Sequence, residues 1–394
     1  MNVKTAKKPQ ERINVEYLSR FNLQTYGNDN LYPQHLQSIT NASGTAALCL
    51  NRYSKFIGGF GFASDILYDY QLNRKKETAD DILQNLASDM ANFGGYAIHV
   101  NYNVLGQITE IAHIPFENCR LEERDDNGNV NHILIHPDWS GTKTKGGKKI
   151  KVDENTIDRI NVFNPNPDVV LAEMEMAGGI NYYKGQVLWK SMKGSYVYPT
   201  PIYDAAITDI STDEGLGNIK YRNVRNNFLI SSMLVTKKGA PQIKIDPNTG
   251  EQYEKYNEMI SADDLLEFQG DENAGKIMLV TLENDEDKPE VVSFPSRNWD
   301  KEFQTTEDSV TSRIYAQFHQ ESWYSIRIGK LGFSGQVMQD AYQQYAGEVT
   351  TEQRFISRAF KRIFENYYDP AIRNEDTNIQ PLKYIAADNN QIID

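Results

Sequence analysis

The sequence predicts an α+β protein, because the spacing of its apolar residues changes along the chain. Over residues 33–56 and 78–93, apolar side chains recur with the period of an amphipathic helix. Between residues 95 and 136 the period shortens to two, which is typical of half-buried strands. From residue 201 helical spacing returns. We therefore expect an α+β domain over residues 1–200, followed by two further helical regions.

The period-two region predicts two β-hairpins in succession. The first, YAIHVNYNVLGQITEIAHI, turns at NVLGQ, and the second turns at DDNGN, where Asn127-Gly128 supplies the positive φ of a tight turn. A further strand is expected in TIDRINVF, and GQVLWKSMKGSYVYPTPIY closes the β-rich region. The basic, glycine-rich loop at residues 140–151 predicts a solvated hairpin tip, with contact to nucleic acid or an acidic partner as the alternative. Its cations are Lys143, Lys145, Lys148, Lys149 and Lys151.

The next part of the chain predicts two helices that flank a small α/β segment. The first helical region covers residues 201–233 and contains two glycines that weaken it. Residues 234–299 contain short strands such as QIKI and KIMLVTL, separated by polar turns that include the acidic run ENDEDKPE. Helical spacing resumes over residues 300–320.

The longest periodic segment follows the stretch GKLGFSG, residues 329–335. Two apolar stripes with i, i+4 spacing run through residues 335–368 without a proline, which predicts one helix on the order of 50 Å long. Residues 369–394 are polar and rich in Asn and Asp, so we expect a loose tail.

GKLGFSG is not a nucleotide-binding loop. Leu331 follows Gly329-Lys330 where a P-loop needs Ser or Thr, and a predicted helix precedes the stretch where a dinucleotide fold needs a strand. Two interpretations remain. The stretch is a connector in which Ser334 caps the next helix, or a mobile loop in which Arg327 and Lys330 touch phosphates without sequence preference.

The sequence offers no catalytic constellation. His132 and His136 share a face of a predicted strand without a local cysteine or a clear carboxylate partner, so we expect satisfied histidines instead of metal ligands. ERDDNGN resembles a calcium loop, but Leu134 stands at the twelfth position, where a bidentate glutamate is needed. No nucleophile motif is present. We expect no enzymatic activity, no cofactor and no metal.

Composition excludes several classes of protein. The net charge of −13 argues against a protein that wraps nucleic acid, and it suits one that lets nucleic acid pass without gripping it. No apolar run approaches the ~18 residues of a membrane span. The basic, polar N-terminus lacks the apolar core of a secretory signal. Cys49 and Cys119 are far apart in the sequence and form no CxxC motif. This pattern predicts buried thiols in a reducing compartment.

The order of these parts resembles that of tailed-bacteriophage portal proteins, in particular the shorter type of siphovirus-like phages. FGGYAIHVNYNVLGQITEIAHIPFENCRL is similar to a glycine-flanked strand, a hairpin and a proline step into another strand. YVYPTPIYDAAITDI resembles the start of the first stem helix, and NNFLISSMLVTKKGAP the passage into the clip. GKIMLVTLENDEDKPEVVSFPSRNWDKEFQTTEDSVTSRIYAQFHQ resembles the return into the second stem helix. GFSGQVMQDAYQQYAGEVTTEQRFISRAFKRIFENYY resembles the long helix after the tunnel loop.

The similarity spans residues 30–370, with two departures from the family pattern. The step after the second stem helix, ESWYSIRIG, has no proline, and GEVTTEQRF lacks the proline that some relatives carry in the long helix. The resemblance implies a portal-like arrangement in seven parts. These are a wing-like α+β domain (1–200), a first stem helix (201–233), a small α/β clip (234–299), a second stem helix (300–320), a tunnel loop (321–334), a long wing-bridging helix (335–368) and a short tail (369–394).

The resemblance also implies a function. Portal proteins form a dodecameric ring at one capsid vertex, which is the conduit for DNA packaging and ejection and the docking site for the terminase large subunit and the head–tail adaptor. For this chain it implies weak, non-specific contact of Arg327, Lys330, Phe333 and Ser334 with double-stranded DNA in the channel. It further implies contact with a major capsid or scaffolding protein, assembly in the bacterial host cytoplasm and a final location in the virion, with no membrane and no cofactor.

Two other functions stay open at the level of sequence. One is a metal-dependent, nucleic-acid-processing enzyme of a mobile element, whose metal site scattered carboxylates would assemble. The other is a different head–tail connector protein, which residues 234–299 would favour if they formed an arm and not a compact clip.

Overall fold

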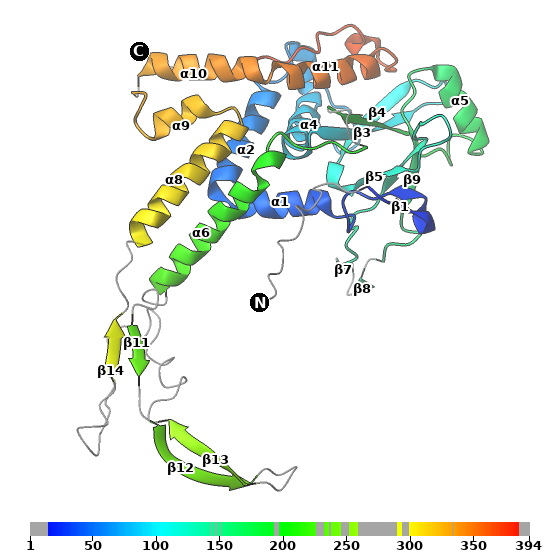
Figure 1. Ribbon diagram of the computed structural model, residues 1–394. Helices are drawn as coiled ribbons and strands as arrows, with labels where there is room; N and C mark the ends of the chain where they lie inside the picture. Colours follow the sequence, from blue (N-terminus) through cyan, green and yellow to red (C-terminus); the bar gives the residue numbers. More distant parts are fainter. Residues whose placement is uncertain are drawn as a thin grey trace. The chain divides into compact units, whose positions relative to one another are not determined.

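The computed structural model confirms the α+β class (Figure 1). It describes residues 15–142, 144–145, 148–149, 151–192, 197–225, 232–235, 238–245, 252–258, 290–293, 299–332 and 334–385. The chain forms two compact units. Unit 1 comprises Met1–Ser211 and Thr311–Asp394, and unit 2 comprises Thr212–Val310. Unit 2 is therefore an insertion in unit 1, and its first boundary lies eleven residues beyond the expected end of the wing-like domain at residue 200.

Unit 1 contains an eight-stranded sheet with the order β1-β2-β5-β6-β9-β10-β3-β4. Neighbouring strands are antiparallel except β9 and β10, which are parallel. The strands are β1 (Tyr17–Leu18), β2 (Leu23–Gln24), β3 (Gly95–Tyr102), β4 (Ile108–Ile114), β5 (Cys119–Glu122), β6 (His132–Ile135), β9 (Asp158–Val162) and β10 (Gln186–Ser191).

Both predicted hairpins are confirmed. β3 pairs with β4 around the turn at residues 103–107, and β5 pairs with β6, with Cys119 opposite Ile135. In the second turn Gly128 has a φ of +81°, the backbone conformation that its position in DDNGN predicts. The lysine-rich loop contains a two-stranded hairpin, β7 (Thr144–Lys145) and β8 (Lys148–Lys149).

Among the described residues, four α-helices precede β3. The single helix expected over residues 33–56 is two, α1 (Tyr32–Ala42) and α2 (Gly44–Gly58), because Ser43 caps the second one by accepting a hydrogen bond from the Ala46 N–H at 3.0 Å. A short helix α3 (Asp65–Asp69) follows. The helix expected at 78–93 is α4 (Ala79–Phe93), which begins with a capping box of Thr78 and Asp81.

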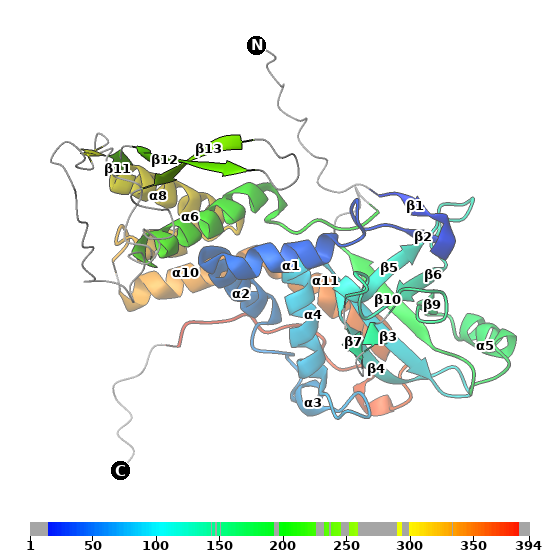
Figure 2. The same ribbon diagram turned by 90° about the horizontal axis from the view of Figure 1, so that it is seen from below.

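The core of unit 1 lies where α4 packs on β3 and β4 and contacts α2. Figure 2 shows α1, α2 and α4 together at one end of the sheet and α5 (Pro167–Met176) at the other. The sequence pattern did not predict α5, which Asn166 caps and Pro167 begins. Its outward face leaves Leu171 and Met176 exposed, so no apolar stripe marks it as a helix.

Helices α6 (Ile207–Arg225) and α8 (Trp299–Gln317) lead out of unit 1 and back into it. A one-turn 3₁₀ helix, Asp204–Ala206, precedes α6. In unit 1, Arg313 pairs with Asp209 at 3.4 Å, and the Gln317 amide donates to the Ile202 carbonyl at 2.6 Å. In unit 2, Lys220 pairs with Glu307. The earlier residue of α6, Asp209, pairs with the later residue of α8, Arg313, and the later residue, Lys220, pairs with the earlier one, Glu307. The two helices therefore run antiparallel.

Unit 2 contains two antiparallel strand pairs among its described residues. β11 (Ser232–Val235) pairs with β14 (Glu290–Ser293), and β12 (Lys238–Ile245) pairs with β13 (Gln252–Glu258). The predicted strand QIKI is part of β12. The predicted strand KIMLVTL lies outside the described residues.

The single helix expected over residues 335–368 is two helices, α10 (Gly335–Glu348) and α11 (Thr350–Phe364). Val349 separates them with a ψ of 3°. The Thr350 hydroxyl donates to the carbonyls of Ala346 and Gly347, at 3.1 and 2.8 Å. Such hydrogen bonds to the preceding turn bend helices, which explains a break that no proline marks. α11 contacts both α2 and α4.

The loose tail expected over residues 369–394 is ordered as far as residue 385. After a 3₁₀ turn at Pro370–Ile372, the chain pairs with the segment that follows α2, where Ile379 lies opposite Phe62. Gly59 allows this approach: its φ is +59°, and a Cβ there would lie 2.1 Å from the Gln380 carbonyl oxygen. The predicted tail is therefore wrong for these residues, because Ile372, Thr377 and Ile379 are buried. Residues 386–394 lie outside the described residues.

Candidate nucleic-acid contact site

The stretch GKLGFSG begins as the C-terminal cap of a short helix, α9 (Glu321–Arg327). The Lys330 N–H donates to the Ser325 carbonyl at 2.9 Å, and the Gly329 N–H to the Ile326 carbonyl at 3.1 Å. These two bonds, with a φ of +73° at Gly329, form a Schellman motif. The first half of the expected tunnel loop, residues 321–334, is thus helical, and Gly329 holds a fixed turn.

Aromatic side chains hold α9 against its neighbours. Trp323 packs on Tyr342 of α10 with 5.1 Å between ring centroids, and the Arg52 guanidinium of α2 lies 4.5 Å from the Trp323 ring. Gln320, which is fully buried, donates its amide to the Cys49 carbonyl and to the Tyr345 hydroxyl, both at 2.8 Å. The turn after α9 therefore follows a helix that is packed firmly against α2 and α10.

The two predicted cations, Arg327 and Lys330, have different surroundings. The Arg327 guanidinium is directed toward Tyr315 of α8, 3.4 Å from its hydroxyl and 5.9 Å from its ring centroid. Lys330 is exposed, and no carboxylate among the described residues pairs with it. Lys330 thus has an ammonium group available to an anion, while Arg327 stacks on an aromatic ring.

Ser334 is the N-cap of α10. Its Oγ accepts a hydrogen bond from the Val337 N–H at 3.2 Å, as the capping interpretation predicts. The hydroxyl proton of Ser334 remains available for a phosphate oxygen. The fourth predicted contact, Phe333, lies outside the described residues.

Three histidines, His35, His113 and His132, have carboxylate partners that the sequence did not indicate. His136 is not the satisfied histidine that was expected, because its buried Nε2 has no hydrogen-bond partner among the described residues. His132 Nδ1 lies 2.6 Å from Glu122 on the neighbouring strand β5, and Arg159 completes this group at 3.1 Å. His113 Nε2 lies 2.7 Å from Asp89 of α4, where burial raises the pKa of the Asp89 carboxyl to about 6. The pairs of His132 and His113 each join two elements of the core, and the described residues contain no group of three or more metal ligands.

Both cysteines are free thiols and are buried, which confirms the predicted burial. Burial raises the pKa of the Cys119 thiol well above its usual range, so the thiol is neutral and unreactive at neutral pH.

None of the described helices has both the length and the apolar character that crossing a bilayer requires.

The solved structures similar to this chain include gene transfer agent components and a phage portal protein. A chain of the virion of the native gene transfer agent particle is 14% identical over 91% of this chain and 84% of its own, with a TM-score of 0.46. A chain of the neck of that particle is 14% identical over 85% and 81%, with a TM-score of 0.47. An HK97-family phage portal protein from Corynebacterium diphtheriae is 9% identical over 71% and 75%, with a TM-score of 0.34.

These TM-scores are below 0.5, so no function of this chain follows from them. Neither a protein-family model nor a curated protein matches the chain.

Proposed function

We propose that the chain is the subunit of a portal ring. In this role it stands at one capsid vertex, conducts double-stranded DNA during packaging and ejection, and offers docking surfaces to a terminase large subunit and a head–tail adaptor. The role is mechanical and needs neither a catalytic residue nor a cofactor.

The observation that carries the proposal is the insertion of unit 2, which begins within α6 and ends within α8. The chain leaves the α+β unit through α6 and returns to it through the antiparallel helix α8. It then continues into α9, a capped turn and α10–α11. This is the order of wing, stem, clip, stem, loop and wing helix that the sequence resemblance implies. The ion pairs Arg313–Asp209 and Lys220–Glu307 support the interpretation of the helices as a paired stem.

The charge of the chain supports a conduit in preference to a DNA-wrapping protein. Each phosphate that a protein neutralises adds affinity through counterion release, so many such contacts would hold the DNA in place. A chain with a net charge of −13 and a small number of exposed cations beside the channel would touch DNA weakly. We assign that contact to Lys330, with Arg327, Phe333 and Ser334 around it.

The remaining features of the proposal come from the family resemblance. We expect a homododecamer that contacts the major capsid protein or a scaffolding protein, assembles in the bacterial cytoplasm and remains in the virion. The seven parts with their boundaries at residues 200, 233, 299, 320, 334 and 368 belong to this proposal.

Electron microscopy of the purified full-length chain tests the proposal. The expected result is a ring with a central channel and a narrow end formed by unit 2. A compact monomer under every assembly condition would contradict it. A ring in which residues 234–299 form extended arms and no compact end would favour another head–tail connector.

A further inference from the structure

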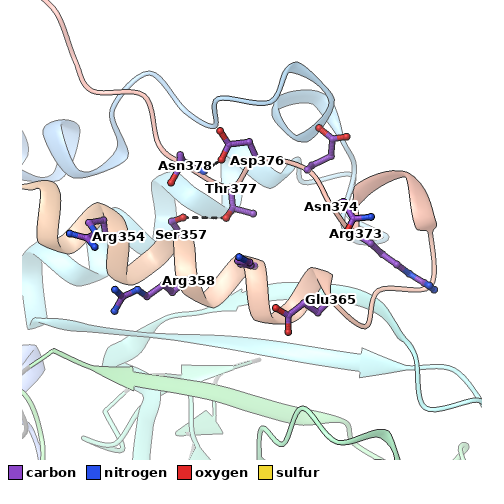
Figure 3. Close-up of a pocket in the computed structure, with 11 residues that line it drawn as sticks. Arg354, Ser357, Arg358, Glu365, Arg373, Asn374, Asp376, Thr377 and Asn378 are labelled. Carbon is purple, nitrogen blue, oxygen red and sulfur yellow. Dashed lines mark hydrogen bonds between the residues drawn. The ribbon is translucent and has the colours of Figure 1, made fainter.

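A pocket of about 580 Å³ lies between α11 and the ordered chain that follows it, residues 373–378 (Figure 3). Ser357 and Thr377 face each other across its floor, with 3.2 Å between their hydroxyl oxygens, and both are buried. All of its lining residues belong to unit 1. The pocket exists because residues 369–385 pack against the unit.

One wall of the pocket is a row of cations on the exposed face of α11. Arg354, Arg358 and Lys361 occupy positions i, i+4 and i+7, and all three are exposed. At 1.5 Å per residue the row is about 10 Å long. Within the part of the chain that the structure describes, no carboxylate forms an ion pair with any of them.

Two more cations are near the row but outside the lining of the pocket. Arg362, next to Lys361 on α11, is exposed, and the pKa of Lys190 on β10 is lowered, first by burial and then by the charge of Arg362. Like charges one helical turn apart destabilise a helix. α11 keeps them in a chain that is acidic overall, which points to an anionic ligand.

In the described part of the chain, none of the carboxylates that line the pocket forms an ion pair with the row. The Glu375 carboxylate accepts a hydrogen bond from the Ser64 hydroxyl at 2.6 Å, and Asp376 Oδ1 accepts one from the Asn378 N–H at 2.9 Å. Figure 3 shows the Asp376 side chain on the side of the pocket away from α11. Glu365 lies past the C-terminal end of the row. These three groups make bonds to their own chain or lie at the edge, while the cations remain unpaired.

Arg373 marks the opposite end of the pocket from Arg354 (Figure 3). Its Nε donates to the Tyr367 carbonyl at 2.6 Å and its Nη2 to the Tyr368 carbonyl at 3.3 Å, which fixes the guanidinium and leaves Nη1 for a ligand. The cations thus extend along the whole pocket, and one small anion would reach only part of them.

We propose that this row, Arg354, Arg358 and Lys361, binds the phosphates of a nucleic-acid backbone. A backbone presents negative charges at short, regular intervals, as the row presents positive ones, and guanidinium groups pair with phosphate in a bidentate manner. An acidic protein would need carboxylates placed individually to match the same spacing. The choice of duplex DNA as the ligand rests on the proposed function, whereas the phosphate site itself does not.

The test measures binding of the full-length chain to a fluorescent duplex of mixed sequence, about 30 base pairs long, by anisotropy at about 50 to 200 mM NaCl. The site variant is R354Q/R358Q/K361Q. The matched control is R74Q/K75Q/K76Q, which removes the same charge from an exposed turn of the same unit. Neither triple variant changes a buried side chain.

For the site variant, the slope of log affinity against log salt should become shallower by about 2.7, which is about 0.9 for each of three lost phosphate contacts. Between about 50 and 200 mM salt, the loss of affinity should then be about 40-fold smaller than in the unmodified chain. The control should keep the original slope, and so should R354K/R358K, which preserves the charge. Equal slopes in both triple variants, loss of binding in R354K/R358K, or no DNA binding by the unmodified chain would overturn the proposal.

Two competitors identify the ligand class. If poly-glutamate binds the row and the duplex does not, the site is assigned to an acidic protein. Inorganic phosphate that displaces the duplex at constant ionic strength would assign it to a free ion. Either result overturns the proposal. Electron microscopy of the same preparations reports ring formation separately, so failure of the phosphate site and failure of the portal function are distinguishable.

Discussion

Arg120 is the largest fully buried side chain of the described residues, and its guanidinium has no carboxylate partner there. It donates instead to Asn30 Oδ1 at 2.6 Å, to the Glu117 carbonyl at 2.9 Å, to the Cys119 carbonyl at 2.7 Å and to the Asn30 carbonyl. The ring of Trp139 lies 5.1 Å from it. Burial lowers the pKa of Arg120 to about 10, so it is charged at neutral pH and ties the loop before α1 to strand β5.

The substitution Arg120→Met keeps the apolar volume and removes every donor. Two acceptors retain a second donor: the Glu117 carbonyl keeps the Gln34 amide at 3.1 Å, and Asn30 Oδ1 keeps the Tyr26 N–H at 3.0 Å. The carbonyls of Asn30 and Cys119 lose the guanidinium. At about 1–3 kcal/mol for each buried acceptor left without its donor, we expect a loss of about 3 kcal/mol in the free energy of unfolding.

Urea unfolding followed by tryptophan fluorescence measures this loss as a lower midpoint with an unchanged slope. Arg20→Met is the matched control, because Arg20 also lies over an aromatic ring, Phe21 at 4.9 Å, but is exposed. The control should stay within about 0.5 kcal/mol of the unmodified chain. An Arg120→Met variant within about 1 kcal/mol would refute the reasoning, because the cost of burying the charge would then cancel its hydrogen bonds.

Three other substitutions test the loop and the core. Lys330→Glu should reduce the retention of packaged DNA and leave ring assembly intact; an unaltered yield of packaged DNA in normal rings would contradict the contact. Gly329→Ala should cost about 1–2 kcal/mol in thermal unfolding because of the positive φ, whereas Gly335→Ala should not. Burial raises the pKa of Asp89 from 3.8 to about 6, so this carboxyl adds about 3 kcal/mol of stability below pH ~4 that is lost as the pH rises through ~6. Asp89→Asn should remove that pH dependence, and an identical pH profile in the variant would contradict it.

Local chemistry made the hairpins and α4 predictable from the sequence. The turn DDNGN needs one residue with positive φ, and Gly128 provides it without help from distant residues. Thr78 and Asp81 form the start of α4 in the same local way. The breaks at Ser43 and Val349 were not predictable from periodicity, because the apolar spacing continues through both while side-chain hydroxyls redirect the backbone.

The order of residues 369–385 depends on distant partners, which composition does not reveal. The segment is polar, yet Ile379 pairs with Phe62, and Arg373 is held by the carbonyls at the end of α11. The partners of the histidines were missed for the same reason. Glu122 reaches His132 from the adjacent strand, across ten residues of chain, and only the strand register places them together.

The cations of α11 were present in the sequence as the polar complement of its apolar stripes. The net charge of −13 does not reveal them, because the net charge determines the electrostatic field only at distances that are large compared with the spacing of the individual charges. At physiological salt the screening length is about 8 Å, so the field at a phosphate near α11 comes from its nearest neighbours. The cations among those neighbours are Arg354, Arg358, Lys361 and Arg362, and no carboxylate of the described residues forms an ion pair with them. If the row binds phosphates as proposed, an acidic chain would repel DNA over most of its surface and still contact it along one helix.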